Sequence, residues 1–369
     1  MIYLDNAATT YKKPESVVRA VKRCIKKYSA NPGRGAHRLS IIAGEAVYDA
    51  RERISKFFHT NSPERVVFTC NTTHALNLAI KAFVKPGDHV LISNLEHNSV
   101  LRPLHKLKET IGVEYSIFNA LTDDLRREIV SHIRSNTKVI ISTAASNVIG
   151  KQIPLDVLAD IKREYNLRLV IDAAQAAGHK KIELDTLSCD AFCFPAHKAM
   201  LGIMGTGACI FGGDFAVEPL MEGGSGTLSK SLYMPTALPE SVEAGTLGLP
   251  GIVALNAGIE FIENYGILEV ERRINYLTGL LIERIASVNG AKIIGADHGV
   301  VSFLVRDLGS EHTAALLDKY GICTRAGLHC APLAHHTVGT FESGTVRASL
   351  SIFNTRKDVD ALYKALKRI

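Results

Sequence analysis

Short apolar runs alternate with longer segments of helical periodicity through the middle of the chain. The runs have the length and the aliphatic and aromatic content of buried strands, and they are Val66–Thr69, Asp88–Ser93, Lys138–Thr143, Arg168–Asp172, Asp190–Phe194 and Ala208–Phe211. Apolar strands that alternate with helices form largely parallel sheets with helices on both faces. The pattern therefore predicts an α/β fold built on a mainly parallel sheet.

Polar residues stand beyond the carboxyl ends of these predicted strands. They are Thr72, His97, Asn147, Asp172 and Lys198. In open parallel sheets, ligands bind beyond the carboxyl ends of the strands, where the following loops converge. The shared position of these residues predicts a single ligand site.

A loop rich in glycine, serine and proline, Gly223–Pro250, ends the alternating region. Gly251–Tyr265 then has the periodicity of a long helix, which we expect to cross to a second domain. The elements expected there are a helix near Leu268–Ala286, a strand at Val300–Val305, a helix at His312–Tyr320 and a strand at Thr345–Ser351. The predicted division is a large domain over residues 12–255 and a smaller α+β domain formed by residues 1–11 and 256–369.

Composition narrows the class of protein. Of the 369 residues, 46% are hydrophobic and 22% are charged, as in globular proteins with a large core. The net charge is +6, and the densest basic segment, Arg19–Lys27, follows a helical pattern typical of a solvated helix face. No arginine-rich run is interleaved with aromatic residues, so we expect no nucleic-acid partner.

The cysteines and the N-terminal residues indicate a compartment. Seven cysteines are an odd number, and most lie in apolar runs, which favours reduced thiols in a cytosolic protein. Residues 1–5 carry neither a basic region nor an apolar signal core, and glycines interrupt the longest uncharged run, Ala199–Gly213. We expect a cytoplasmic protein without a membrane anchor.

The segment Asn71–Thr73 follows a strand directly and opens a helix. Free backbone N–H groups, two hydroxyls and the positive end of a helix would meet there, which suits a phosphate group. An ordinary helix cap explains the same residues. Both interpretations remain open from this segment alone.

Asp172 closes an apolar strand, so its carboxylate is held near the core and needs a cationic partner. A protonated pyridine nitrogen would be such a partner, and Gln175 lies close enough in sequence to reach a ring substituent. Capping of the next helix is the alternative role for Asp172.

Lys198 follows a strand that is almost entirely apolar, where a lysine tends to lose its charge and can form a Schiff base. His197 beside it could donate to a phosphate. A lysine that merely extends its amine to solvent is the structural alternative. Together with the phosphate-binding helix start and Asp172, however, Lys198 completes the set of partners that pyridoxal phosphate requires.

Short motifs along the whole chain carry a resemblance to a known family. They are Tyr3–Thr10, Arg34–His37, Asn71–Thr73, Ala75–Asn77, Glu96–His97, Ser146–Gly150, Asp172–Gln175, His197–Lys198, Glu243–Thr246, Arg325–Ala331 and Arg347–Leu350. With these motifs the chain resembles the cysteine desulfurases of the class V aminotransferase family, in the branch that includes selenocysteine lyases. The resemblance implies the type I aminotransferase fold, with a mainly parallel seven-stranded sheet in the large domain.

The resemblance also implies roles around pyridoxal 5'-phosphate. Lys198 would hold the cofactor as a Schiff base and shuttle the α-proton, and His97 would stack on the ring and assist proton transfer. The remaining contacts would be Asp172 with the ring nitrogen, Gln175 with the ring oxygen, and Thr72, Thr73 and His197 with the phosphate. Thr246 would reach the phosphate of a neighbouring subunit, which implies a homodimer with shared sites.

For the substrate, the resemblance implies that Asn147 and Arg347 hold the carboxylate of L-cysteine or L-selenocysteine. Cys330 would take the sulfur as a persulfide, release alanine, and pass the sulfur to an acceptor protein that supplies iron–sulfur clusters, thiolated tRNA or a similar sink. His329 and Arg325 would give the thiol an electropositive setting. By composition alone, Cys330 could equally be a structural thiol.

The histidines near Cys330 do not have a consistent ligand spacing, so we expect no metal. Pro195 departs from the family pattern, because serine or threonine is usual there and proline offers neither a hydroxyl nor an N–H. Two alternatives remain: selenocysteine lyase or removal of sulfinate on the same fold, and a non-catalytic sulfur-relay protein that does not retain the cofactor.

Overall fold

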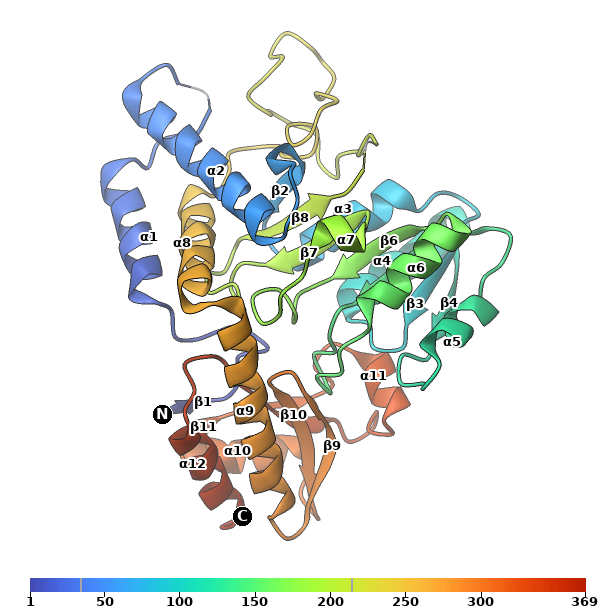
Figure 1. Ribbon diagram of the computed structural model, residues 1–369, viewed down its shortest axis with the longest axis vertical. Coiled ribbons are helices and arrows are strands. Elements are labelled where there is room, and N and C mark those ends of the chain that lie inside the picture. Colours follow the sequence, from blue (N-terminus) through green and yellow to red (C-terminus); the bar gives the residue numbers. More distant parts are fainter. Residues whose placement is uncertain (34, 214) are drawn as a thin grey trace.

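The computed structural model describes residues 1–33, 35–213 and 215–369, so Arg34 of the Arg34–His37 motif lies outside the described residues. Its largest sheet has seven strands in the order β2-β8-β7-β6-β5-β3-β4 (Figure 1). The strands are β2 (Val66–Thr69), β3 (His89–Ser93), β4 (Glu114–Phe118), β5 (Thr137–Thr143), β6 (Arg168–Asp172), β7 (Ala191–Pro195) and β8 (Gly207–Phe211). Only β8 runs against its neighbours, which confirms the predicted α/β fold with a mainly parallel sheet.

The sequence pattern predicts every strand of this sheet except β4. This strand lies at the edge of the sheet and pairs only with β3. Its Glu114 and Ile117 are exposed, and only Phe118 is buried. An edge strand that is half exposed lacks the continuous apolar run by which the buried strands are recognised.

Helices cover both faces of the sheet, because alternate strand residues point to opposite sides. On one face, Val90, Val139 and Val170 pack with residues of α3 (Thr72–Phe83) and α4 (Asn98–Ile111). On the other face, Leu91 and Ile140 belong to a core shared with further helices. These are α2 (Arg38–Phe57), α5 (Leu125–Ser131), α6 (Leu155–Tyr165), α7 (Leu184–Leu187) and α8 (Leu249–Tyr265).

Three phenylalanines anchor β7, the strand that leads into His197 and Lys198. The ring of Phe58 lies 4.9 Å from that of Phe192 and 5.0 Å from that of Phe194, and all three side chains are fully buried. Such a cluster buries large apolar areas and fixes the strand on which the lysine loop is built.

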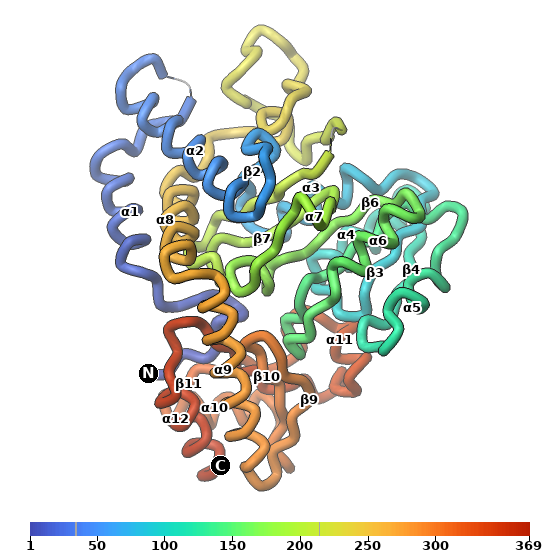
Figure 2. Tube along the Cα trace, in the orientation of Figure 1, coloured from blue at the N-terminus to red at the C-terminus, as the bar shows by residue number. Residues whose placement is uncertain are grey.

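The smaller part of the molecule contains a four-stranded antiparallel sheet in the order β12-β13-β10-β9. Its strands are β9 (Ala291–Asp297), β10 (Val300–Val305), β12 (Arg325–Gly327) and β13 (Thr345–Ser349), and its helices are α9 (Ile267–Ala286), α10 (Ser310–Lys319), α11 (Pro332–Thr337) and α12 (Arg356–Leu366). Beside them, β1 (Ile2–Tyr3) pairs in parallel with β11 (Ile322–Cys323). Both chain termini lie in this part (Figure 2).

The passage between the two parts follows α8 and α9, which meet at Gly266 with φ of +90°. Helix α8 packs against α1 (Glu15–Lys27) and α2, and its Ile259 belongs to the core of the larger part. Ile262, one turn later, belongs to the core of the smaller part. The chain thus passes from one hydrophobic core to the other near the end of α8. The domain boundary at residue 255 stays a prediction.

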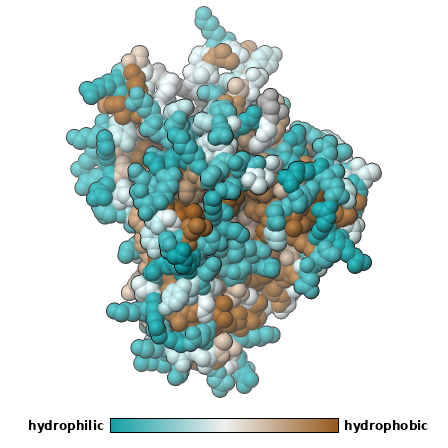
Figure 3. Space-filling model, viewed as in Figure 1, coloured by the Kyte–Doolittle hydropathy of each residue, from teal (hydrophilic) through white to brown (hydrophobic). Residues whose placement is uncertain are grey.

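The exposed surface is mixed in character. On the face seen in Figure 3, hydrophilic residues predominate and apolar residues form scattered patches. The basic residues of α1 are exposed, as the sequence predicts for Arg19–Lys27. Among the described helices, none is both long and apolar enough to span a membrane.

Candidate active site

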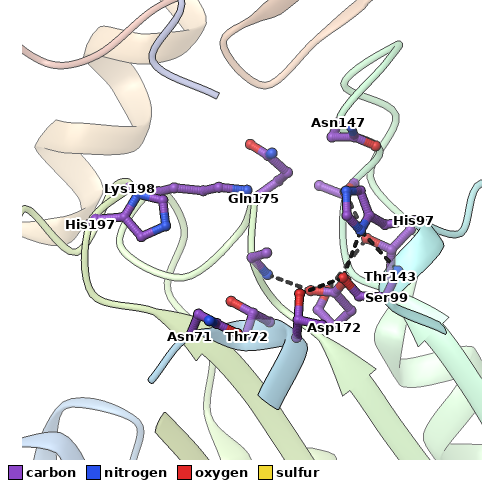
Figure 4. Close-up of a pocket in the computed structure, with 13 residues that line it drawn as sticks. Asn71, Thr72, His97, Ser99, Thr143, Asn147, Asp172, Gln175, His197 and Lys198 are labelled. Carbon is purple, nitrogen blue, oxygen red and sulfur yellow. Dashed lines mark hydrogen bonds between the residues drawn. The ribbon is translucent and has the colours of Figure 1, made fainter. Parts of the chain in front are cut away.

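A cavity of about 230 Å³ lies at the carboxyl ends of the central strands. Figure 4 shows the Lys198 side chain extending toward Gln175, with His97 on the other side of the cavity. The residues that line it are Asn71, Thr72, Thr73, His97, Ser99, Thr143, Ala145, Asn147, Asp172, Ala174, Gln175, His197 and Lys198. The structure thus brings together the polar residues predicted at the strand ends.

The first turn of α3 forms one wall of this cavity. Asn71 caps the helix, and its side-chain oxygen accepts a hydrogen bond of 2.9 Å from the backbone N–H of His74. The cap leaves the amides of Thr72 and Thr73 at the positive end of the helix dipole, with two hydroxyls beside them. The cap uses only the backbone N–H of His74. This segment can therefore both cap the helix and bind an anion.

Asp172 ends β6 with a side chain that is almost completely buried. Its Oδ1 accepts a hydrogen bond of 2.9 Å from the backbone N–H of Ala174. Burial raises the pKa of this carboxyl, while the Ala174 N–H and the charge of Lys198 act in the opposite direction. A cation in the cavity would stabilise the ionised carboxylate, as a protonated ring nitrogen does.

Lys198 faces the same cavity from the loop after β7. Burial lowers the pKa of its amine to about 8, although nearby Asp172 favours the charged form. An amine with such a pKa is partly neutral near physiological pH and can act as a nucleophile or a base.

His197 joins this loop to the N-terminal segment. Its carbonyl accepts hydrogen bonds from the backbone N–H of Thr10 at 3.1 Å and from the Nζ of Lys13 at 2.9 Å. Burial, with the charges of Lys198 and Lys13, lowers the pKa of the His197 ring to about 4. Its buried Nδ1 has no partner among the described residues, so the ring can still bind a ligand in the cavity.

His97 caps α4 and presents a neutral ring. Its Nδ1 accepts a hydrogen bond of 3.1 Å from the backbone N–H of Ser99. Burial, followed by the charge of Lys198, lowers the pKa of His97 to about 4. Because Nδ1 is an acceptor, the proton of the neutral ring lies on Nε2. A flat, neutral imidazole suits stacking on a bound ring.

Pro195 does not line the cavity. Alternation along β7 places it on the face that holds Ala191 and Cys193, which α3 covers. This face leads to the first turn of α3, where Ser99 Oγ lies 2.8 Å from Thr73 Oγ1. The hydroxyls of Thr73 and Ser99 both line the cavity, whereas Pro195 does not.

Asn147 and Arg347 contact each other across the junction between the two parts of the molecule. Arg347 Nη1 donates to the backbone oxygen of Asn147 at 2.9 Å, and Arg347 Nη2 lies 2.9 Å from Asp5 Oδ1. The Nδ2 of Asn147 donates to the carbonyl of His329 at 2.7 Å. The two residues expected to bind a carboxylate therefore lie together, with Asn147 also holding the loop before Cys330.

Cys330 is exposed, on the loop between β12 and α11. Its carbonyl accepts a hydrogen bond of 2.8 Å from the backbone N–H of Asn98, the residue next to His97. His329 and Cys330 both adopt left-handed backbone conformations, with φ of 48° and 58°. These unusual conformations and the bond to α4 hold the thiol loop beside the cavity.

The predicted electropositive setting of Cys330 needs a correction. His329 is 5% exposed, and burial, followed by the charges of Arg347 and neighbouring groups, lowers its pKa to about 2. The His329 ring is therefore neutral and adds no positive charge beside the thiol. Arg325 on β12 is exposed and remains the cation of this loop.

Thr246 lies outside the main cavity, on the loop between β8 and α8. It is exposed and lines a separate cavity of about 110 Å³. Buried Glu243 fixes this loop by accepting a hydrogen bond of 2.6 Å from the backbone N–H of Phe68 and by pairing with Arg51. Thr246 therefore does not contact the main cavity of its own chain. Its predicted contact with the cofactor phosphate of a second subunit stays a prediction.

Comparisons with known proteins identify the family. The family description "Aminotransferase class-V" matches residues 2–362. A protein described as a probable cysteine desulfurase from Halalkalibacterium halodurans is 33% identical, over all of this chain and 93% of its own length. The structure of an apo cysteine desulfurase from Thermococcus onnurineus NA1 superimposes with a TM-score of 0.90 at 30% identity, covering 100% of this chain and 94% of that one.

A more distant structure shares the fold at 18% identity, with a TM-score of 0.85 over 99% of this chain and 96% of its own. It is described as a lysine-to-alanine variant with glycine covalently linked to the PLP cofactor. The chain belongs to the class V aminotransferase family, whose enzymes depend on pyridoxal phosphate, and within that family it is a member of the cysteine desulfurases.

The residues of the cavity fit pyridoxal phosphate. The helix start at Thr72 offers amides and hydroxyls to a phosphate, and buried Asp172 favours a cationic ring nitrogen. His197 and Lys198 line the same cavity. This donor set combines an anion site, a carboxylate and an amine, as the cofactor requires.

The sequence interpretation missed two contributors to this site. Ser99 lines the cavity and forms hydrogen bonds with both His97 and Thr73, and because Thr73 lies on another helix, no spacing within one segment indicates that contact. Glu96 is fully buried, and its Oε1 accepts a hydrogen bond of 2.7 Å from the backbone N–H of Thr143. The Glu96–His97 motif marks this residue in the sequence, but nothing local indicates that its carboxylate is buried and bonded to β5.

Proposed function

We propose that this protein converts L-cysteine to L-alanine and transfers the sulfur to Cys330 as a persulfide, for delivery to an acceptor. The observation that carries the proposal is the attachment of the Cys330 loop to the cavity. The carbonyl of Cys330 binds the amide of Asn98, and the carbonyl of His329 binds Asn147. An exposed thiol beside a lysine-containing cavity is the arrangement that sulfur transfer to the protein needs.

The residues of the chain would divide the work as follows. Bound pyridoxal phosphate would supply an electron sink for the bonds at the substrate α-carbon. The amine of Lys198, with its lowered pKa, would hold the cofactor and move the α-proton. Asp172 would keep the ring nitrogen protonated, Gln175 would bind the ring oxygen, and Thr72, Thr73 and His197 would bind the phosphate.

Neutral His97 would stack on the ring and assist proton transfer through Nε2. Arg347 and Asn147 would orient the substrate carboxylate, the former through the planar fork of its guanidinium. Burial of Arg347 strengthens this contact, because a guanidinium removed from water pairs more strongly with an anion.

The sulfur step balances without an added oxidant or reductant. The Cys330 thiolate attacks the substrate sulfur, so a sulfur–sulfur bond forms while the carbon–sulfur bond breaks. A proton then replaces sulfur on the substrate β-carbon. Cysteine and a thiol thereby give alanine and a persulfide, and the exposure of Cys330 leaves that persulfide accessible to an acceptor.

We further propose a cytoplasmic homodimer in which Thr246 contacts the cofactor phosphate of the neighbouring subunit. The exposure of Thr246, away from its own cavity, supports this arrangement. Iron–sulfur cluster assembly and tRNA thiolation are proposed destinations for the sulfur.

The test combines two variants. Purified protein should show a visible absorption band from bound cofactor that is absent in Lys198→Ala, and loss of this difference would support a non-catalytic sulfur-relay protein. In Cys330→Ala, alanine release from cysteine should fall by at least about 100-fold. If that release persisted, or if only selenocysteine or cysteine sulfinate were consumed, the proposed sulfur transfer would be wrong and one of those substrates would replace cysteine.

A further inference from the structure

The N-terminal residues 4–10, here called the N-terminal strap, contact residues of the candidate site from both parts of the molecule. On one side the strap is attached to β13: the backbone N–H of Ser349 donates to the oxygen of Leu4 at 2.6 Å, and the N–H of Ala7 donates to Ser349 Oγ at 2.9 Å. These bonds join the beginning of the chain to the strand that carries Arg347.

On its other side the strap contacts two cavity residues of the larger part. Gln175 Nε2 donates to the carbonyl of Ala7 at 3.0 Å, and the N–H of Thr10 donates to the carbonyl of His197 at 3.1 Å. The strap therefore lies between Arg347 and the loops expected to hold the cofactor. A side chain of the strap that reaches Arg347 can therefore hold its guanidinium in place.

Asp5 is that side chain. Its Oδ1 lies 2.9 Å from Nη2 of Arg347, whose side chain is 3% exposed. Nη1 of Arg347 is bonded to the carbonyl of Asn147, and buried Nε has no partner among the described residues. Two nitrogens of the guanidinium thus have acceptors within the chain, and of these two acceptors Asp5 is the one that carries the opposite charge.

We propose that Asp5 is a positioning residue for substrate recognition, fixing the Arg347 guanidinium in the orientation in which it binds the α-carboxylate of the amino-acid substrate. The inference rests on the proposed function, in which Arg347 binds that carboxylate. A guanidinium is planar, so acceptors on both Nη1 and Nη2 fix the plane of the group. Without Asp5, the plane is held only by the bond to Asn147.

The charge of Asp5 has a second effect. A buried arginine without a counter-charge is unfavourable, and burial lowers the pKa of Arg347 while Asp5 raises it. Asp5 thus stabilises the buried cation before substrate binds. The Asp5→Asn variant keeps an oxygen acceptor but removes the charge, whereas Asp5→Ala removes both.

The test compares two ligands that differ only in the carboxylate, L-alanine and ethylamine, on the cofactor-loaded protein. Binding is measured from the change in cofactor absorption, and steady-state alanine release gives kcat and KM for cysteine. Asp5→Ala should weaken L-alanine binding and raise KM about tenfold or more, with a smaller effect in Asp5→Asn. Ethylamine binding and kcat should change less than about twofold.

Asp360→Asn is the matched control, because Asp360 pairs with Arg284 at the same distance of 2.9 Å, away from the cavity. It should leave both ligands unaffected. Equal weakening of L-alanine and ethylamine by the Asp5 variants, or no weakening of either, would overturn the inference. If the wild-type protein binds L-alanine but releases no alanine from cysteine, the proposed function is wrong. The comparison of L-alanine and ethylamine binding between the wild type and the Asp5 variants would still decide the role of Asp5.

Discussion

Gly150 lies where the loop after β5 meets the turn between β9 and β10, at the junction of the two parts of the molecule. Its φ is +72°, and a Cβ placed on it would lie 1.9 Å from the backbone oxygen of Asp297 and 2.5 Å from its carbonyl carbon. Since the opposing atoms belong to the backbone, no side-chain rotation can relieve the overlap. Gly150→Ala therefore has to move one part relative to the other.

The size of that movement follows from the contact. Ordinary van der Waals contact begins at 3.4 Å, so the backbone of Asp297 has to retreat by about 1.5 Å. Asn147, three positions earlier on the same loop, accepts a 2.9 Å hydrogen bond from Arg347 across the junction. A displacement of this order separates the groups that are proposed to bind the substrate carboxylate, and misplacement by about 1 Å can reduce activity about 100-fold.

The control is Gly112→Ala, because Gly112 has a φ of +70° and no atom within 4 Å of the added Cβ. Both variants incur the left-handed backbone cost of about 1 kcal/mol, and only Gly150→Ala adds the overlap, for which we expect about 3 kcal/mol more. Urea unfolding measures the free energy, and alanine release from cysteine measures kcat/KM. If the two variants agree within about 0.5 kcal/mol and about twofold in kcat/KM, the reasoning about this junction is wrong.

Two further predictions concern Glu96 and Pro195. Burial raises the pKa of Glu96 to about 8. Between about pH 4.5 and about pH 8 the folded chain therefore binds more protons than the unfolded chain. The stability that this group contributes is lost as pH rises through that range. In Glu96→Gln, the urea midpoint of unfolding should fall less steeply as pH rises over this range. An unchanged slope would show that Glu96 does not cause the fall. Pro195→Ser should tighten cofactor binding about tenfold, as measured by equilibrium dialysis, because it adds a hydroxyl. Pro219→Ser is the control. If Pro195→Ser and the wild type bind the cofactor equally well, the hydroxyls of Thr73 and Ser99 suffice.

The sequence predicts those elements of the fold whose burial is visible in the residues of a single segment. The buried strands β2 and β6 have the predicted boundaries, because a strand covered on both faces must be apolar throughout. Edge strand β4 escapes prediction since half of it faces solvent. Among the site residues, Asp172 and Lys198 follow from their positions at strand ends, because topology brings those ends together.

Contacts between distant segments could not be predicted in the same way. Asp5 and Arg347 are 342 positions apart, and nothing in either segment indicates that they form an ion pair. The neutrality of His329 depends on the burial of its ring against His335 and Thr345, which composition does not reveal. The bond from Asn98 to the Cys330 carbonyl depends on the placement of one part of the molecule on the other.

The N-terminal strap also determines when the site can form during synthesis. The strap precedes the sheet of the larger part in the sequence, yet its partners Cys323 and Ser349 follow that sheet. The sheet of the larger part can fold while synthesis continues, whereas the strap has to wait for these partners until residue 349 has been added. Nascent chains released before residue 349 would therefore contain Lys198 in a folded sheet but lack the bonds between the strap and β13.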